Sequence, residues 1–128
     1  MDKLTHMHLL SLDIGTRHTG VAFYDSATGI PLPLSTIHHK NRAELLAAVR
    51  TFKEERSIDR IIVGMPLLPS GDEGSQARLT LEIVDALRNN GFDVETIDER
   101  YSTPKQSKGI DPDAAAACGI LEMYVARQ

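Results

Sequence analysis

The sequence contains no tryptophan and one cysteine, and aromatic residues occupy only 5% of its 128 positions. A chain with so few aromatic rings is poorly suited to binding single strands by stacking bases on its surface. One cysteine cannot form an intrachain disulfide, which favours a reducing compartment. Cys118 lies among alanines in a helical pattern, so we predict that it is a small core residue rather than a nucleophile.

Long apolar runs are also missing. No stretch approaches the roughly 20 apolar residues that a membrane-spanning helix needs. The first six residues are too polar for a secretory signal. We therefore expect a cytoplasmic protein with no membrane partner. The net charge of −4 argues against unspecific coating of nucleic acid, although catalytic carboxylates would themselves contribute to such a charge.

With 128 residues, 41% of them hydrophobic, the chain is predicted to form one domain over residues 1–128. Residues 9–23 are the most informative stretch of the sequence. It begins as an apolar strand that carries Asp13 near its end, turns between Gly15 and Gly20, and continues as a second strand over 21–24.

A third strand is predicted over 30–37. Its two prolines remove backbone donors, which suits an edge strand. Residues 38–40 are predicted to be an exposed linker, and the histidine pair within it has too few companions for a zinc site.

Helices and strands are predicted to alternate along the rest of the chain. The predicted elements are a helix capped by Asn41 and ending near residue 56, a strand over 60–64, a helix over 73–90 stopped by Gly91, a strand over 93–98, and a helix that begins at Asp111. The continuously apolar strand over 60–64 is typical of a central, parallel position. The resulting fold class is α/β, a five-stranded mixed sheet in the order β-β-β-α-β-α-β-α with helices on both faces.

The start of the last helix carries two aspartates with different predicted roles. Asp111 precedes Pro112 and is predicted to be the N-cap. The spacing of Asp113 places it on the inward stripe of the helix. That stripe is predicted to contain Ala116, Ala117, Ile120, Leu121 and Tyr124. A carboxylate on a buried stripe needs a compensating partner.

Three carboxylates are predicted to lie close together. Asp13 lies near the end of the first strand and Glu99 follows the last strand, while Asp113 opens the final helix. Ligands in α/β sheets gather at the carboxyl ends of parallel strands. Three such carboxylates could hold two Mg²⁺ ions, or Mn²⁺, roughly 3.5–4 Å apart for phosphodiester hydrolysis.

Each carboxylate also has a simpler interpretation. Asp13 could be hydrogen-bonded within its own turn, Glu99 could pair with a nearby basic residue, and Asp113 could interact with the helix dipole. Asp98 rivals Glu99 as the second ligand, because adjacent side chains of a strand point to opposite faces.

Several short motifs then occur together in one order. They are LDIG at 12–15, GVA at 20–22, VGMPL at 63–67, GDEG at 71–74, DERYST at 98–103, and Asp113 followed by two apolar pairs at 116–117 and 120–121. Together they resemble the YqgF/RuvX family, Holliday-junction-resolvase-like nucleases with an RNase H-like fold. That family is linked to trimming the precursor of small-subunit ribosomal RNA. In the family a longer segment tends to precede the final Asp, whereas here only residues 104–112 intervene, which we predict to be a loop.

The resemblance implies that Asp13, Glu99 and Asp113 form the acidic, metal-binding triad and that the loop over 64–76 borders the active site. Glycines in such a loop permit close backbone approach, and the following helix start offers amides to a phosphate. Nearby arginines could contact flanking phosphates, although solvated surface charges are the simpler interpretation. The candidate substrate contacts are Arg17, Gly64, Pro66, Gly71, Gly74, Arg78 and Arg100.

The function expected from this pattern is a metal-dependent nuclease that processes the precursor of 16S ribosomal RNA, with ribosomal particles as further partners. One alternative is a resolvase-like nuclease acting on branched DNA. A second is a weakly catalytic ribosome-assembly or nucleic-acid-binding factor. A third, drawn from the Asp-Ile-Gly-Thr at 13–16, is an actin-like ATPase, but such proteins place nucleotide between two domains.

Overall fold

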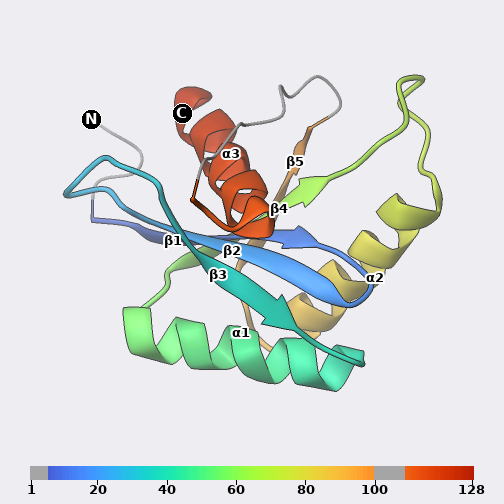
Figure 1. Ribbon diagram of the computed structural model, residues 1–128, viewed down its shortest axis with the longest axis horizontal. Coiled ribbons are helices and arrows are strands. Elements are labelled where there is room, and N and C mark those ends of the chain that lie inside the picture. Colours follow the sequence, from blue (N-terminus) through green and yellow to red (C-terminus); the bar gives the residue numbers. More distant parts are fainter. Residues whose placement is uncertain (1–5, 100–108) are drawn as a thin grey trace.

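The computed structural model describes residues 6–99 and 109–128. Its eight helices and strands follow the predicted order, and Figure 1 shows their arrangement. The elements within this part of the chain are β1 (His8–Ile14), β2 (His18–Asp25), β3 (Leu32–His38), α1 (Arg42–Arg56), β4 (Arg60–Met65), α2 (Ser75–Asn89), β5 (Val94–Asp98) and α3 (Pro112–Ala126).

The five strands form one mixed sheet in the order β3-β2-β1-β4-β5. β1, β2 and β3 are joined as antiparallel neighbours, while β4 pairs in parallel with both β1 and β5. The predicted central position of the apolar strand β4 and the edge position of β3 are confirmed. β3 begins at Leu32, later than predicted, and Ile30 before it is exposed.

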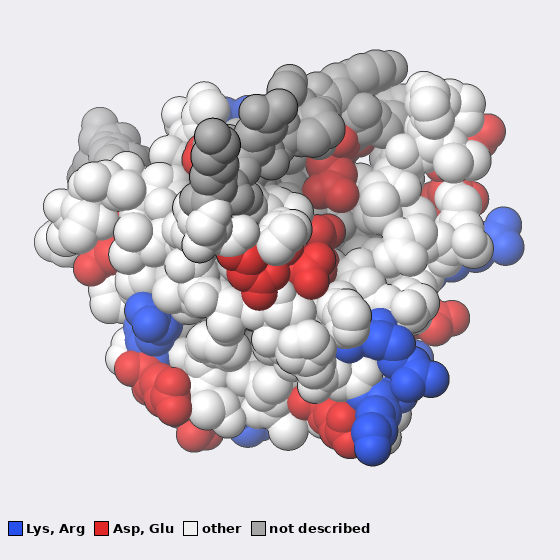
Figure 2. All heavy atoms as spheres, in the orientation of Figure 1, with Lys and Arg blue, Asp and Glu red and all other residues white. Residues whose placement is uncertain are grey.

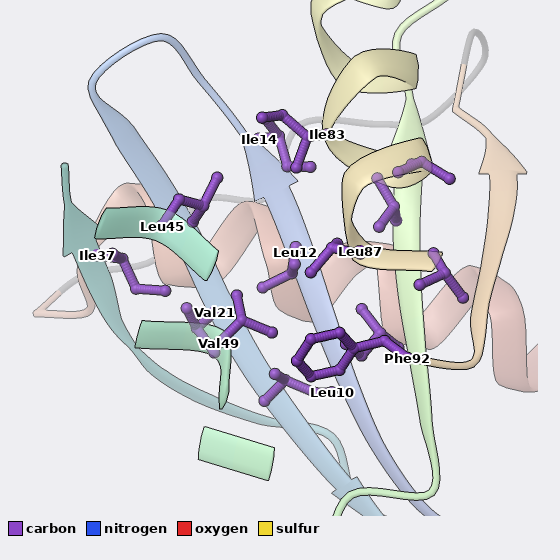
Figure 3. Packing of buried hydrophobic residues seen from close by; sticks show 14 of the residues in the cluster. Leu10, Leu12, Ile14, Val21, Ile37, Leu45, Val49, Ile83, Leu87 and Phe92 are labelled. Carbon is purple, nitrogen blue, oxygen red and sulfur yellow. The ribbon is translucent and has the colours of Figure 1, made fainter. Parts of the chain in front are cut away.

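The strands have hydrophobic residues on both faces because helices cover both. Alternate residues of β1 divide between the two cores: Leu10 and Leu12 belong to the core under α1 and α2, and Leu9 belongs to the core under α3. Figure 3 shows the first core, in which Leu87 of α2 lies beside Leu12 and Leu45 of α1 belongs to the same cluster. Figure 1 shows α3 on the opposite side of the sheet from α1. The predicted helices on both faces are confirmed.

The predicted helix ends are also found. The Asn41 side chain accepts a hydrogen bond from the Glu44 amide at the start of α1, and Gly91 adopts a left-handed φ of 89° just after α2. Asp111 caps α3 by accepting from the Asp113 amide, with Pro112 directly after the cap. These local signals fix where α3 begins, and therefore where Asp113 lies.

Other details of the prediction are wrong. β2 begins at His18 rather than at residue 21, because the turn after β1 is shorter than predicted, and α2 begins at Ser75 rather than at residue 73. Ala116 is exposed, whereas Ala114, Ala115 and Cys118 are buried with the rest of the inward face of α3. His39 is buried at 7% exposure instead of lying in an exposed linker, because its ring is hydrogen-bonded to Thr19. The predicted core position of Cys118 is confirmed. No helix within residues 6–99 and 109–128 has the length and apolar character to cross a bilayer.

Candidate functional site

Asp13 lies on the face of the sheet that α3 covers. Strand alternation places it on the same side as Leu9 and Ser11. The Ser11 hydroxyl donates a 2.6 Å hydrogen bond to the Ala117 carbonyl, which fixes α3 above β1. Asp13 is therefore only half-buried at the end of a strand whose other residues, apart from the first, are buried.

The same alternation separates Glu99 from its rival Asp98. Ile97 packs in the core under α3, so the side chain two residues later falls on this face too, whereas Asp98 points to the opposite face. The Glu99 amide donates to the Met65 carbonyl at 3.3 Å, which continues the register of β5 beside β4. Glu99 thus reaches the face that carries Asp13.

Two glycines make room for the partners of Asp13. Gly20 is the register partner of Asp13 on β2, and a methyl group there would overlap the Asp113 carbonyl. In β4, Gly64 directly follows the residue that pairs with Leu12. A methyl group at Gly64 would overlap the Glu99 carboxylate and Ile120. Because Gly20 and Gly64 lack side chains, Asp113 can approach Asp13 over β2, and Glu99 can approach it over β4.

The carboxylates affect one another electrostatically. Burial raises the pKa of Asp13, and the charge of Asp113 raises it further. The pKa of Glu99 is raised to about 7, first by burial and then by the charges of Asp13 and Asp98. Asp13 is thus the central member, with Asp113 and Glu99 on either side. Burial and mutual repulsion both disfavour the charged carboxylates, and a bound cation would favour them.

Asp113 is held at the start of α3 by a small hydrogen-bond network. The Thr36 hydroxyl of β3 donates to the carboxylate of Asp111 and lies 3.3 Å from Oδ2 of Asp113. The hydrogen bond from Thr36 is also the main reason that the pKa of Asp111 is lowered. Asp111, fully exposed, therefore serves as a cap, and Asp113 is the aspartate directed toward Asp13.

The loop after β4 returns to the end of β1. The Gln76 side-chain amide donates a 2.7 Å hydrogen bond to the carbonyl of Ile14, the residue after Asp13. Gly71 has a left-handed φ of 93°, Gly74 caps α2 without a side chain, and Pro66 is half-buried. This contact places the start of α2 beside the carboxylates.

Two of the three candidate arginines lie within the residues that the structure describes. Arg17 is exposed in the turn between β1 and β2, and Arg78 is exposed in the first turn of α2. Arg100 and the predicted loop before Pro112 lie largely outside the described residues. Figure 2 shows acidic side chains gathered near the middle of the face below α3, with the visible Lys and Arg toward its margins.

The donor set suits a hard divalent cation. Asp13, Glu99 and Asp113 offer only oxygen ligands, are half-buried, and within residues 6–99 and 109–128 form no ion pair with Lys or Arg. No three His, Cys, Asp or Glu side chains of these residues are arranged around a ready-made metal position. A cation would therefore have to draw the carboxylates together.

Sequence reasoning did not find the supporting residues. Ser11, Thr36 and Gln76 are polar side chains that fix α3, Asp113 and α2 around the end of β1. The Gly20 position was present in the GVA motif, but its packing against α3 follows only from the register. Ser11 offered one usable signal, since it is a hydroxyl inside an otherwise apolar strand.

The sheet order, the helices on both faces and the acidic cluster at the carboxyl ends of β1 and β5 define an RNase H-like fold of the resolvase type. The structure of Thermus thermophilus RuvC in complex with a Holliday junction substrate superposes with a TM-score of 0.62 over 95% of this chain and 96% of that chain, at 13% identity. The fowlpox virus Holliday junction resolvase gives 0.58 over 95% and 100%, at 12% identity. These two likenesses concern the fold.

Residues 7–127 match the RuvX family, described as Holliday junction resolvase, and the chain belongs to that family. It is 34% identical over 130 residues to the "Putative pre-16S rRNA nuclease" of Chloroflexus aurantiacus, covering 91% of this chain and 85% of that protein. The suspected family membership and the RNase H-like fold are both confirmed.

Proposed function

We propose that this protein is a divalent-metal-dependent nuclease that trims the precursor of 16S ribosomal RNA. Membership of the RuvX family, and relatives whose names state this activity, support the reaction class and the substrate. The observation that supports a metal is the group of carboxylates around Asp13, in which burial and, second to it, neighbouring negative charge raise the pKa values of Asp13 and Glu99. A single domain is proposed as well, because all five strands of the described residues belong to one sheet.

Asp13, Glu99 and Asp113 are proposed as the metal ligands and the catalytic group. Bound Mg²⁺ or Mn²⁺ would supply an activated water and stabilise the leaving oxygen. Asp13, on β1, would contribute the central oxygens, and the other two carboxylates would close the site from β5 and α3. Because its pKa is raised to about 7, Glu99 would lose a proton more readily once a cation is bound beside it.

The residues around the triad are proposed to position the nucleic acid. Arg17, in the turn after Ile14, and Arg78, two residues after Gln76, are exposed and are proposed to contact flanking phosphates, as is Arg100. The backbone at Gly71, Gly74 and Pro66 would form the wall of the site. Gly64 would act indirectly, by leaving space for the Glu99 carboxylate.

The test is cleavage of a 16S precursor transcript by the purified protein while Mg²⁺ is titrated. Asp13→Asn should lower the rate by on the order of 10³-fold, because it removes the central ligand charge. Asp85→Asn, which changes an exposed carboxylate on α2, is the matched control and should cleave normally. Equal activity of Asp13→Asn and the control, at unchanged fold, would refute the proposal.

A second candidate is a resolvase-like nuclease acting on branched DNA, which the family description and the likeness to RuvC favour. Offering a four-way junction and the ribosomal precursor to the same enzyme preparation distinguishes the two. If the chain binds the precursor without cutting it at any Mg²⁺ concentration, a role as a ribosome-assembly factor replaces both. The proposed location, beside assembling ribosomal particles, is the cytoplasm.

A further inference from the structure

Two exposed histidines face each other next to the acidic site. His18 begins β2 and His38 ends β3, and the two are register partners across the antiparallel pair. Their ring centroids are 4.8 Å apart with the planes at 70°. Figure 1 shows the start of β2 and the end of β3 side by side. Two imidazoles at this separation can both donate N–H groups to one small anion.

The register fixes where this pair lies relative to the carboxylates. His18 is two residues before Gly20, the partner of Asp13, and His38 is two residues after Thr36, which lies beside Asp113. Residues two apart in a strand share a face and are separated by about 7 Å. The histidine pair therefore forms the next row on the same face. The spacing between this row and the row of Gly20 and Thr36 is comparable to that between consecutive phosphates of a nucleic-acid strand.

The backbone under the pair is anchored from the other side of the sheet. The buried His39 ring is hydrogen-bonded to the Thr19 hydroxyl at 2.8 Å, and the His39 amide donates to the Arg17 carbonyl at 3.0 Å. Burial lowers the pKa of His39, and the nearby His18, Arg17 and His38 lower it further. The His39 amide contact with Arg17 and the register pairing of His18 with His38 place these three residues at the same corner of the sheet.

The exposed rings are not needed to hold the fold. Within the described part of the chain neither His18 nor His38 forms a hydrogen bond through its ring; the two rings contact each other, and His38 also lowers the pKa of the nearby Asp111. Arg17 is exposed as well. Three nitrogen-donor side chains thus face solvent beside a carboxylate cluster in a chain of net charge −4. Such a chain needs local donors to bring a polyanion to its acidic site.

We propose that Arg17, His18 and His38 form a phosphate-binding subsite that holds the nucleic-acid phosphate adjacent to the one cleaved. The subsite rests on the proposed nuclease function for its substrate, a phosphodiester backbone. It makes no base contact, so it contributes affinity and register rather than sequence preference. The guanidinium of Arg17 supplies a permanent charge, and the two imidazoles supply directed N–H donors.

Binding without cleavage tests the subsite. In an Asp13→Asn background, the affinity for an oligouridylate strand is measured in Mg²⁺-free buffer, alone and with His18→Ala and His38→Ala together. The double change should weaken binding by about fivefold to tenfold, as expected for the loss of two solvent-exposed contacts to a charged group. His6→Ala, which removes an exposed ring beyond the other end of β1, is the matched control and should bind as the parent does. Unchanged affinity of the double variant, or an equal loss in the control, would overturn the subsite.

A second measurement identifies the ligand chemistry. When inorganic phosphate is titrated into the Asp13→Asn protein, the imidazole NMR signals of His18 and His38 should shift while that of His6 stays in place. Signals that respond to Zn²⁺ and not to phosphate would make the pair a metal site and refute the proposal. Both assays are independent of cleavage. Failure of the unmodified protein to cut the ribosomal precursor would therefore remove the proposed function without deciding the subsite.

Discussion

Two groups of charged residues lie against α3 at opposite ends of the sheet, and they differ in how their charge is balanced. At the start of β4, Arg60 pairs with Asp93 at 3.2 Å and Glu95 at 3.4 Å, and the Tyr124 hydroxyl donates to Glu95 at 2.8 Å. At the other end, Asp13, Glu99 and Asp113 face one another, with no Lys or Arg of residues 6–99 and 109–128 in an ion pair with them.

The difference separates a structural group from a functional one. In the Arg60 group each charge meets an opposite charge or a hydroxyl, and the protein itself completes the network. Around Asp13, burial and the repulsion between carboxylates together raise the pKa values of Asp13 and Glu99. A site that keeps uncompensated charge at a cost in stability is typical of ligand binding.

The largest effect is expected at Gly20, where Gly20→Ala would place a methyl group on the Asp113 carbonyl. The obstacle is helix backbone, so α3 must move, and we expect a loss of about 2–3 kcal/mol in the free energy of unfolding together with loss of cleavage. Urea unfolding measures the first. A variant as stable as the parent would show that β2 and α3 are not in close contact.

Glu99→Gln should stabilise the metal-free protein at alkaline pH. The folded state retains a proton up to about pH 7 that the unfolded chain loses near pH 4.5. The stability contributed by protonated Glu99 is therefore fully present below about pH 4.5 and is lost as pH rises through about 7. The full shift corresponds to about 3 kcal/mol, which solvent screening of this partly exposed side chain reduces to about 1–2 kcal/mol.

The measurement compares the unfolding free energies of Glu99→Gln and the parent from about pH 5 to about pH 8 in the presence of a chelator. The difference should grow with pH in favour of the variant, while its cleavage activity is lost. Asp98→Asn changes the neighbouring carboxylate on the opposite face, and cleavage should survive in it. If Asp98→Asn loses activity and Glu99→Gln keeps it, the assignment of the two residues is reversed.

Mg²⁺ should stabilise the parent, because cation binding relieves the repulsion around Asp13. At about ten times the dissociation constant the gain is about 1.4 kcal/mol, seen as a rise in melting temperature. The rise should be smaller in Glu99→Gln and absent in Asp13→Asn. An equal rise in all three proteins would indicate that Mg²⁺ binds elsewhere.

The smallest effect is expected at the balanced group. Arg60→Met should cost about 1 kcal/mol or less, because these pairs are partly exposed, and it should leave cleavage unaffected. The two ends of the sheet would then respond in opposite ways. Neutralising Glu99 stabilises the protein and inactivates it, whereas removing Arg60 destabilises it and leaves it active. A strong loss of activity in Arg60→Met would contradict this division.

Much of the fold follows from local signals in the sequence. The apolar residues of 9–14, the prolines predicted to lie in the third strand and the Asp-Pro start of α3 each indicate the local structure within a few residues. The convergence of Asp13, Glu99 and Asp113 was predictable as well, because strand ends and helix starts could be ordered along one edge of a sheet. The choice between Asp98 and Glu99 required the pairing of β5 with β4, which no local pattern contains.

The remaining features depend on contacts between distant segments. The burial of His39 reflects its hydrogen bond to Thr19, twenty residues earlier. Likewise, the need for Gly20 arises only when the Asp113 backbone crosses β2. Ala116 was misplaced because small residues surround the first turns of α3, so that hydrophobicity alone does not mark the inward side.

The edge strand β3 has a consequence for the behaviour of the protein in a crowded cell. Pro33 has no amide hydrogen to offer an incoming strand, and the irregularity at Val21/Ala22 interrupts the regular pairing of β2 with β3 beside it. Two copies meeting along this margin would find no continuous ladder of donors to share. The same strand that brings Thr36 to the carboxylates therefore also resists sheet-to-sheet aggregation.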